Sequence, residues 1–193
     1  MSIYELALDF TAKTNRSLFI TGKAGTGKTT FLHRLRDTTN KQIAVVAPTG
    51  VAAINAGGVT IHSFFQLPFA PFMPTREGEA ALISKLKMNT ARRNTIRELE
   101  LLVIDEISMV RADVLDAIDT VLRYVRHRSN EPFGGVQMIF IGDMYQLSPV
   151  VKSEEWSLLS QYYQGVYFFN SKVLENNQPV YIEFDKVFRQ SDS

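Results

Sequence analysis

The run GKAGTGKT at residues 22–29 constrains this chain more than any other feature. It follows an apolar stretch of strand length at residues 18–20 and precedes Phe31, Leu32 and Leu35, which have helical spacing. Glycines permit a tight turn that points N–H groups inward, the start of a helix favours anions, lysine reaches β- and γ-phosphates, and threonine ligates Mg²⁺. The run therefore predicts a phosphate cradle, formed by Gly22, Ala24, Gly25, Thr26, Gly27, Lys28, Thr29 and Thr30.

The composition sets broad limits on the protein. A length of 193 residues suits one domain with a buried core and a small insertion. The net charge of +1 argues neither for nor against nucleic acid, and the absence of cysteine excludes disulfides and thiolate metal sites. Glu5 and Asp9 interrupt the apolar N-terminus, and no apolar run has the length of a membrane span. We therefore expect a cytoplasmic or nucleoid-associated protein without membrane contact.

Unbroken apolar runs of strand length recur along the chain, at residues 43–47, 101–104 and 138–141. Such runs are typical of parallel strands that are covered on both faces. The predicted fold class is therefore α/β, a mostly parallel sheet flanked by helices on both faces. We expect later strands of the same sheet at residues 167–169 and 181–184.

Helical spacing of apolar residues predicts three further helices. One precedes the first strand, and we expect it to pack on the core through Ile3, Leu6, Ala7 and Phe10. A short helix at residues 51–56 stops at two glycines. Residues 114–125 carry the apolar stripe of a crossover helix, which Asp113 can cap.

Polar side chains follow two of the predicted strands. Asp105 and Glu106 end one of them, and the alternation of side chains along a strand predicts that they point to opposite sides. One carboxylate can then hold Mg²⁺ while the other polarises a water, as phosphoryl transfer requires. Gln146 follows another strand at the ligand-facing edge of the sheet. It either binds the γ-phosphate or the attacking water, or is a polar turn residue.

Six motifs stand in the order that superfamily 1 helicases have. They are GKAGTGKT, APTGVAA (47–53), TIHSFF (60–65), LLVIDEISM (101–109), GDMYQLSPV (142–150) and VFRQ (187–190). The chain resembles most closely the Pif-type (petite integration frequency) 5′-to-3′ DNA helicases, with RecD-like enzymes as near neighbours. The similarity runs from about residue 17 to residue 190. TIHSFF and GDMYQLSPV are far more discriminating than the phosphate loop by itself.

The resemblance implies a role for each matching residue at the nucleotide. Lys28 and Thr29 would bind ATP·Mg²⁺, and Asp105 would order the metal. Glu106 would be the general base, and Gln146 would sense the γ-phosphate. The implied fold is that of a RecA-like P-loop NTPase.

Arg189 would be an arginine finger between two RecA-like domains, whereas without the resemblance it is only a surface arginine. The chain stops at Ser193, so we expect residues 1–193 to be the first RecA-like domain and the second to be absent. Such a fragment would bind ATP and hydrolyse it poorly. These helicases usually read adenine with a glutamine near the N-terminus, but the first glutamine here is Gln42. Adenine selectivity is therefore open.

The resemblance also implies a grip on single-stranded DNA through hydroxyls and backbone N–H groups on phosphates. The matching residues are Pro48, Thr49, Gly50, Thr60, His62 and Phe64. His62 and Phe64 would add contacts to bases or sugars, because stacking on single strands tolerates any sequence. Core packing is the alternative for both residues, and it is favoured for Phe64.

A small insertion is predicted at residues 66–98. Its first part, residues 66–78, contains three prolines and cannot be a helix or a central strand. Phe69 and Phe72 lie where such helicases carry an element that helps to separate strands, but we expect them to fold back on the domain. The segment at residues 85–97 is the most basic part of the chain. A solvated helix face and a nucleic-acid contact explain it equally well.

The function implied is an ATP-dependent DNA helicase acting as a monomer on single-stranded and on forked or partly duplex DNA. Family roles are DNA repair, recombination and telomere maintenance, at the nucleoid in bacteria and in the nucleus or mitochondria in eukaryotes. The rivals are an ATP-dependent regulatory switch and a RecD-like recombination subunit or relaxase-associated helicase. The phosphate loop fits the switch equally well, whereas TIHSFF and GDMYQLSPV favour the helicase.

Overall fold

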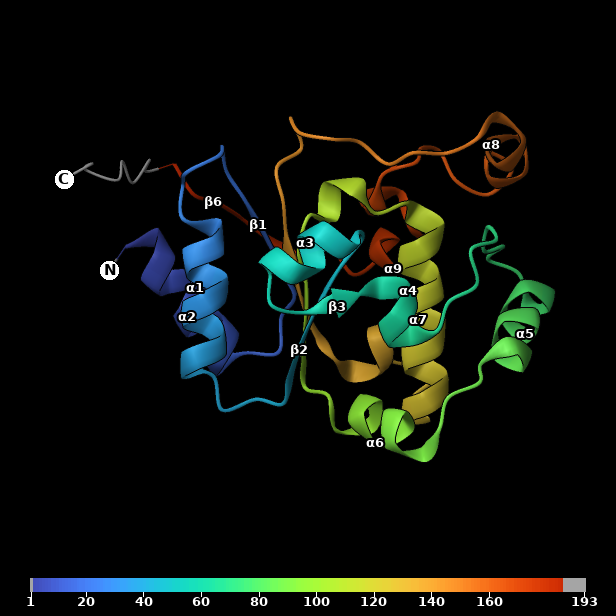
Figure 1. Ribbon diagram of the computed structural model, residues 1–193, viewed down its shortest axis with the longest axis horizontal. Coiled ribbons are helices and arrows are strands. Elements are labelled where there is room, and N and C mark those ends of the chain that lie inside the picture. The colour runs from blue at the N-terminus through green and yellow to red at the C-terminus, as the bar shows by residue number, and fades with distance from the viewer. Residues whose placement is uncertain (1, 186–193) are drawn as a thin grey trace.

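Six parallel strands form one sheet in the order β3-β2-β4-β5-β1-β6, as seen in a computed structural model that describes residues 2–185 (Figure 1). The strands are β1 (Leu18–Thr21), β2 (Ile43–Ala47), β3 (Val59–Thr60), β4 (Leu101–Ile104), β5 (Gln137–Ile141) and β6 (Val180–Glu183). The predicted parallel α/β fold is confirmed, because every pair of neighbouring strands in this sheet is parallel.

Helices cover both faces of the sheet (Figure 1). They are α1 (Ile3–Lys13), α2 (Lys28–Thr38), α3 (Gly50–Asn55), α4 (Ile61–Phe65), α5 (Arg76–Lys85), α6 (Thr90–Glu98), α7 (Ala112–Arg126), α8 (Ser153–Leu159) and α9 (Lys172–Glu175). Short 3₁₀ segments are η1 (Ile107–Met109), η2 (Pro132–Gly135) and η3 (Phe168–Asn170). Among the described residues, no helix is both long and apolar enough to cross a lipid bilayer.

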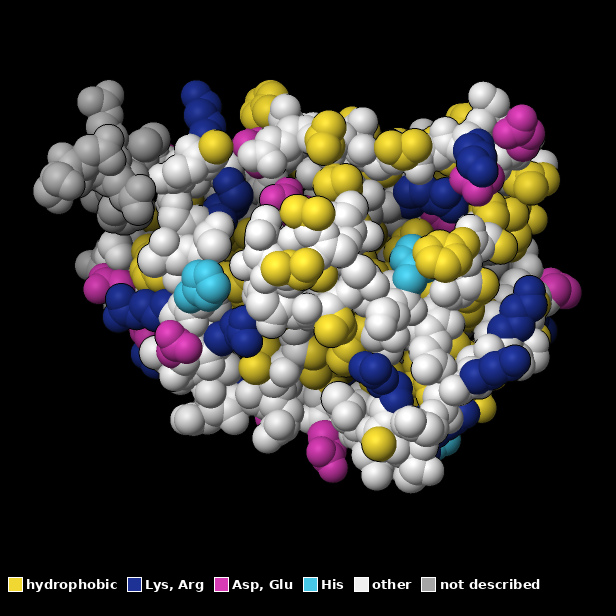
Figure 2. All heavy atoms as spheres, in the orientation of Figure 1, with side chains coloured by type: hydrophobic (Ala, Val, Ile, Leu, Met, Phe, Trp, Pro, Cys, Tyr) yellow, Lys and Arg dark blue, Asp and Glu magenta, His cyan; other side chains and the backbone are white. Residues whose placement is uncertain are grey.

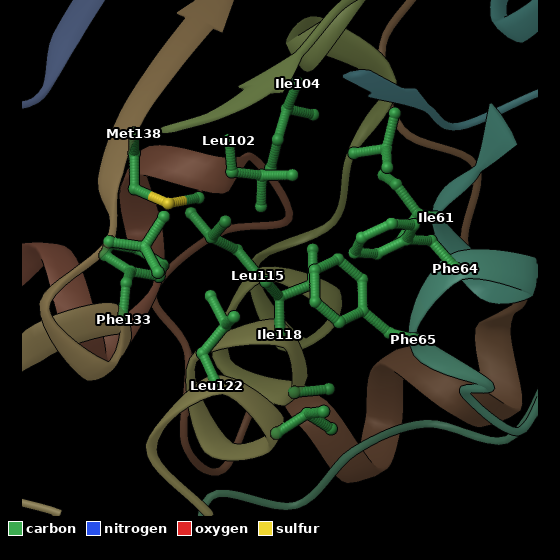
Figure 3. Close-up of a cluster of buried hydrophobic side chains, with 14 of the residues drawn as sticks. Ile61, Phe64, Phe65, Leu102, Ile104, Leu115, Ile118, Leu122, Phe133 and Met138 are labelled. Atoms are coloured by element: carbon green, nitrogen blue, oxygen red, sulfur yellow. The ribbon is translucent and has the colours of Figure 1, made fainter. Parts of the chain in front are cut away.

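Alternating residues of the strands pack into two separate hydrophobic cores, one on each face of the sheet. Leu18 and Ile20 belong to the core beneath α1 and α2, whereas Phe19 belongs to the core on the other face. On that second face, α7 and α4 meet the central strands through the side chains in Figure 3. These include Leu102, Ile104, Leu115, Ile118, Ile61 and Phe65, all at most 1% exposed. Their burial on one face follows from the period-2 geometry of a strand and the apolar stripe of a helix.

The N-terminal helix packs on a face different from the one predicted. Ser2 and Glu5 form a capping box that starts α1. Ala7 is buried as expected, but Ile3 and Leu6 are 40% and 42% exposed. The buried polar residue on this helix is Thr11, whose hydroxyl bonds the Ala7 carbonyl. The prediction is wrong for Ile3 and Leu6, because the helix places Tyr4 and Leu8 against the core in their stead.

The predicted strand at residues 167–169 is wrong, whereas the strand near residues 181–184 is confirmed as β6. Tyr167 makes one isolated bridge to Arg111, and the chain then turns into η3. Phe168 is 1% exposed and packs edge-on against Phe19, with ring centroids 5.2 Å apart. Its apolar side chain therefore fills the core from a turn instead of from a strand.

The proline-rich segment is an irregular loop up to residue 75, as predicted. The prediction is wrong for residues 76–78, because α5 begins at Arg76, after Thr75 caps the helix by accepting from the Gly78 N–H. Phe72 is 7% exposed and does fold back on the domain. The same expectation is wrong for Phe69, which is 88% exposed. In the basic segment, Arg93 and Arg97 donate to the carbonyls of Met88 and Val125, so these two guanidinium groups help to fasten α6.

Asp116 joins α7 to the segment that contains α9. Its carboxylate accepts hydrogen bonds from the Tyr163 hydroxyl at 2.8 Å and from the backbone N–H groups of Lys172 and Val173 at 2.9 and 3.0 Å. Burial raises the pKa of Asp116 to about 6, in spite of these three bonds. The group therefore titrates in a pH range that is easily reached in solution.

We expect Asp116→Asn to remove part of the pH dependence of stability. The folded chain binds the Asp116 proton more tightly, with a pKa raised from 3.8 to about 6. The resulting stabilisation is full below pH 4 and is lost as the pH rises through 6. The unfolding free energy of the wild type in urea should therefore fall relative to that of Asp116→Asn over this range. Parallel profiles would contradict this, and Asp37→Asn, at an exposed carboxylate of α2, is the control.

Candidate functional site

Four of the predicted motifs leave the same edge of the sheet. The phosphate loop follows β1, Pro48 follows β2, Asp105 follows β4 and Gly142 follows β5. Because these strands are parallel, their carboxyl ends lie side by side. The topology thus assembles a site from segments that are distant in the sequence.

The phosphate loop has the backbone of an anion cradle. Gly22, Gly25 and Gly27 have φ angles of 148°, 81° and 91°, which side chains other than glycine rarely adopt. The loop is braced from within, because the Thr26 hydroxyl donates to the Lys23 carbonyl at 2.8 Å. Gly27 is the N-cap of α2 and offers no side-chain cap, so the first N–H groups of this helix are open to a ligand.

The remaining cradle residues lie at the start of α2. The Lys28 ammonium donates to the carbonyls of Gly22 and Lys23, so its side chain lies back across the loop. Thr29 and Thr30 are exposed on the first turn of α2. These positions leave both hydroxyl groups accessible from solvent.

Asp105 and Glu106 do not continue the alternation of β4, because the strand ends at Ile104. The prediction that the two side chains point to opposite sides assumed that the strand continues through both residues, and this assumption is wrong. Glu106 takes a left-handed conformation with φ 51°, and its N–H donates to the Asp105 carboxylate at 3.0 Å. The Asp105 N–H donates to the Val46 carbonyl at 2.9 Å, which ties the turn to β2.

The positive charge of Lys28 acts on the pKa of both Asp105 and Glu106, which we call the acid pair. Burial raises the pKa of Asp105, against the lowering effect of the Glu106 N–H and of Lys28. Burial also raises the pKa of Glu106, with further upward contributions from Asp105 and Asp143 and a downward one from Lys28. A carboxylate with a raised pKa is a better proton acceptor than an exposed one.

Asp143 is a site residue that the sequence reasoning missed. It is 6% exposed, accepts from the Tyr145 N–H at 3.0 Å, and accepts from the Gln146 side-chain amide at 3.3 Å. Gln146 itself is exposed. Asp143 thus orients Gln146 and also raises the pKa of Glu106. Its place two residues after the end of β5, next to Gly142, was the available signal.

A cavity of about 640 Å³ opens beside the phosphate loop. It is lined by Ser2, Ile3, Tyr4, Glu5, Thr26, Thr30, Arg34, Phe184 and Asp185. Tyr4 packs against Phe184 with ring centroids 5.8 Å apart, and the Arg34 guanidinium lies 5.9 Å from the Tyr4 ring. Aromatic walls and one cation next to a phosphate cradle suit a nucleobase.

A second cavity, of about 350 Å³, lies along the same edge of the sheet. It is lined by Pro48, Thr49, Ile61, His62, Phe69, Ala70, Met109, Val110, Arg111, Val114, Ser148 and Val150. Thr49 and Thr60 accept helix-capping bonds from Ala52 and Ser63, and Gly50 begins α3. The Phe64 side chain is 5% exposed, in agreement with the core packing favoured for it.

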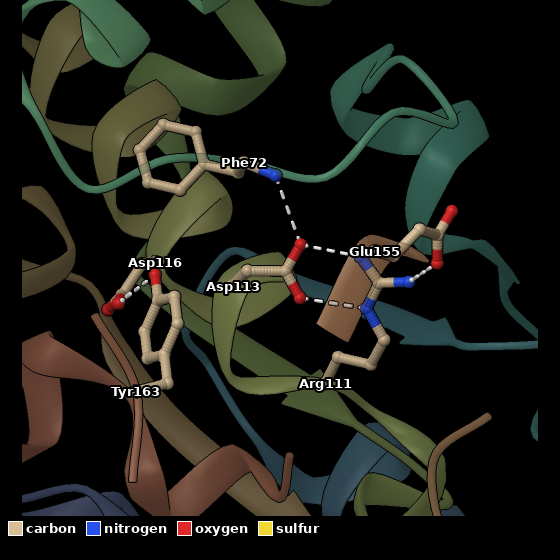
Figure 4. A network of polar contacts seen from close by, with 6 residues as sticks. All are labelled: Phe72, Arg111, Asp113, Asp116, Glu155 and Tyr163. Atoms are coloured by element: carbon tan, nitrogen blue, oxygen red, sulfur yellow. Dashed lines mark hydrogen bonds and ion pairs between the residues drawn. The ribbon is translucent and has the colours of Figure 1, made fainter. Parts of the chain in front are cut away.

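Arg111 organises the wall of this second cavity (Figure 4). Its guanidinium forms two hydrogen bonds to Asp113, at 2.7 and 2.8 Å, and a third to Glu155 at 2.8 Å. Asp113 also accepts from the Phe72 N–H at 3.0 Å. The predicted cap was wrong, because Arg111 is the N-cap residue and Asp113 lies inside α7, bonded to the proline-rich loop. Arg189 lies outside the described residues.

The cradle, the acid pair and the parallel sheet together define a P-loop nucleotide-binding protein with a RecA-like α/β fold. A model of the PIF1-like helicase family matches residues 1–193. The chain belongs to the PIF1-like helicase family, which confirms the resemblance read from its motifs.

Individual relatives agree with this assignment. ATP-dependent DNA helicase PIF1 of Candida albicans is 46% identical over 140 residues, which are 70% of this chain and 15% of that protein. Bacteroides Pif1 bound to ssDNA has a TM-score of 0.89 and 44% identity, covering 100% of this chain and 43% of that one. Bacteroides sp Pif1 in complex with ADP-AlF4 gives the same four values. The chain therefore spans less than half the length of each of these relatives.

We expect Gly22→Ala to lower the free energy of unfolding by about 1–3 kcal/mol. The φ angle of Gly22 is unfavourable for alanine, and the added Cβ would collide with the Phe184 carbonyl and lie 2.6 Å from the Thr26 hydroxyl. Gly50→Ala is the matched control, because its Cβ would meet no atom within 4 Å. Urea unfolding of both variants checks this, and equal stabilities would contradict the strained geometry of the cradle.

Proposed function

We propose that this chain is the first RecA-like domain of an ATP-dependent DNA helicase, which binds ATP and single-stranded DNA at one edge of its sheet. The observation that carries the proposal is the short segment that joins the acid pair to the wall of the second cavity. The turn that holds Asp105 and Glu106 continues directly through η1 to Arg111, so the nucleotide site and the second cavity share one short segment. The family assignment and the DNA and nucleotide complexes of Bacteroides Pif1 support it.

In this proposal the phosphates of ATP lie on the N–H groups of the loop and of the first turn of α2. Lys28 exchanges its bonds to the Gly22 and Lys23 carbonyls for the β- and γ-phosphates. The base occupies the cavity beside Tyr4 and Phe184.

The residues present fit a magnesium ion. Mg²⁺ prefers oxygen ligands and keeps several of its waters, so it uses few protein groups besides substrate phosphates. The accessible Thr29 hydroxyl and the Asp105 carboxylate supply such a pair. No cluster of three or more potential acidic or histidine ligands occurs within residues 2–185, which suits a site completed by the nucleotide. When bound, the ion neutralises charge on the phosphates.

Glu106 is the proposed general base. Its raised pKa suits it to accept a proton from the attacking water, and Gln146, held by Asp143, orients that water or the γ-phosphate. Arg189 is proposed as the arginine finger, and an arginine at this position is worth about 10³–10⁵ in rate in related phosphoryl transfers. We therefore propose slow hydrolysis when a second RecA-like domain does not close the site.

The second cavity is the proposed single-strand site. Pro48, Thr49 and His62 line this cavity, and His62 brings a half-buried ring. The backbone N–H groups of Thr49, Gly50 and Thr60, together with the two threonine hydroxyls, are proposed to bind the phosphates next to Pro48. Forked or partly duplex DNA is the proposed substrate of the whole protein, which acts as a monomer in DNA repair, recombination or telomere maintenance. Its proposed location is the nucleoid in bacteria and the nucleus or mitochondria in eukaryotes.

DNA-stimulated ATP hydrolysis tests this function most simply. Adding single-stranded oligonucleotide to the protein should raise the rate of hydrolysis, and the oligonucleotide affinity should fall steeply with salt, as counterion release requires. An ATP-dependent switch would hydrolyse ATP at a rate that the oligonucleotide leaves unchanged.

We expect ATP·Mg²⁺ to stabilise the protein and Lys28→Ala to abolish most of that effect. A ligand at one hundred times its dissociation constant adds roughly 2.7 kcal/mol to the free energy of unfolding. Thermal unfolding with and without nucleotide measures the change, with the exposed Lys23→Ala as a control in the same loop. Identical nucleotide-induced shifts in the wild type and Lys28→Ala would rule out the cradle.

We expect Glu106→Gln to keep nucleotide binding and to lose turnover by about 10²–10⁴-fold, because the amide removes the base but spares Asp105. Single-turnover hydrolysis and an equilibrium titration with nucleotide separate the two effects. A hydrolysis rate equal to that of the wild type would refute the role of Glu106.

A further inference from the structure

Phe69 is an exposed aromatic residue that the proposed function does not yet use. Its side chain is 88% exposed, although it lies on the rim of the second cavity together with Pro48 and Thr49. Its ring stacks on His62, with centroids 4.9 Å apart and planes only 12° from parallel. Figure 2 shows a histidine and hydrophobic side chains beside basic ones in the hollow above α4.

The backbone on both sides holds this ring in place. Helix α4 ends at Phe65, and its C-cap residue Gln66 has a left-handed conformation with φ 53°. The Leu67 N–H then donates to the His62 carbonyl at 3.1 Å. Leu67 and Phe72 are each 7% exposed, and the Phe72 N–H is bonded to Asp113. The exposed Phe69 therefore lies between two buried residues of the loop, Leu67 and Phe72.

The ring pair is apolar in character. Burial and the nearby Arg111 lower the pKa of His62, against an opposing effect of Asp113. The imidazole is therefore neutral at neutral pH, and it supports the Phe69 ring as a flat partner instead of binding a phosphate. One face of Phe69 rests on His62, and the other face is open to solvent.

We propose that the open face of Phe69 is a stacking platform for one unpaired base of a single strand that runs over Pro48 and Thr49. His62 is a positioning residue, which fixes the angle of the platform. The inference rests on the proposed single-strand site and names a base contact within it. Aromatic rings bind bases of any sequence through their π-faces, which suits a protein that moves along a strand.

The test compares Phe69→Ala, Phe69→Tyr and the wild type for binding to a short oligo-dT. Phe69→Ala should weaken binding by about tenfold, which corresponds to about 1.4 kcal/mol, whereas Phe69→Tyr keeps the ring and should bind like the wild type. Phe169→Ala is the matched control. Phe169 is a 51% exposed ring stacked on Tyr167 at 5.3 Å, and it does not line this cavity.

An abasic oligonucleotide separates stacking from other effects. Without bases, Phe69→Ala and the wild type should bind equally. On a separate oligo-dT that carries one 2-aminopurine, the wild type should quench the fluorescence of this base, and the quenching should be lost in Phe69→Ala and reduced in His62→Ala. Equal binding of oligo-dT by the wild type and Phe69→Ala, or an equal loss on abasic strands, would overturn the platform while leaving the single-strand site intact. Absence of salt-sensitive binding by the wild type would overturn both.

Discussion

The parallel pairing of β4 between β2 and β5 is the constraint on which the rest of the structure depends. Backbone hydrogen bonds place Leu101 beside Ile43 on one side and beside Gln137 on the other. Parallel strands need crossover helices, so each loop at the carboxyl edge starts a new covering segment. The phosphate loop, the acid pair and the Gly142 turn therefore lie at the same edge of the sheet, although they are far apart in the sequence. Loss of that pairing would separate the acid pair from the phosphate loop and from the Gly142 turn, which follow the directly paired strands β1 and β5.

Two polar networks hold side chains in place along this edge of the sheet. In the first network, Asp143 accepts a hydrogen bond from Gln146 and raises the pKa of Glu106 in the acid pair. In the second, Arg111 binds Asp113 and Glu155, and Asp113 also binds the loop at Phe72. Bidentate pairing of arginine with a carboxylate fixes geometry as well as charge. The part of the chain from Ile107 to Arg111 lies between the two networks. Only a few residues therefore separate the acid pair from the wall of the second cavity.

Local sequence patterns predicted the features that local geometry dictates. The phosphate loop and the central strands could be located because they require glycines with positive φ or unbroken apolar runs. The orientation of Glu106 could not, because it depends on where β4 stops. Phe168 lies in a strand-like run but fills a gap in the core that only the folded chain contains. The ion pair between Arg111 and Glu155 could not be predicted either, because the two residues lie 44 positions apart in the sequence.

Nucleotide and single strand are proposed to bind at one edge of the sheet and to share the segment after the acid pair. Equilibrium titration of a non-hydrolysable ATP analogue, with and without a saturating short oligo-dT, measures the coupling between them directly. Linkage requires that each ligand change the affinity for the other by the same factor. We expect a reciprocal change of about fivefold or more, in the range typical of coupled sites. Identical analogue affinities with and without the oligonucleotide, when both ligands bind, would contradict it.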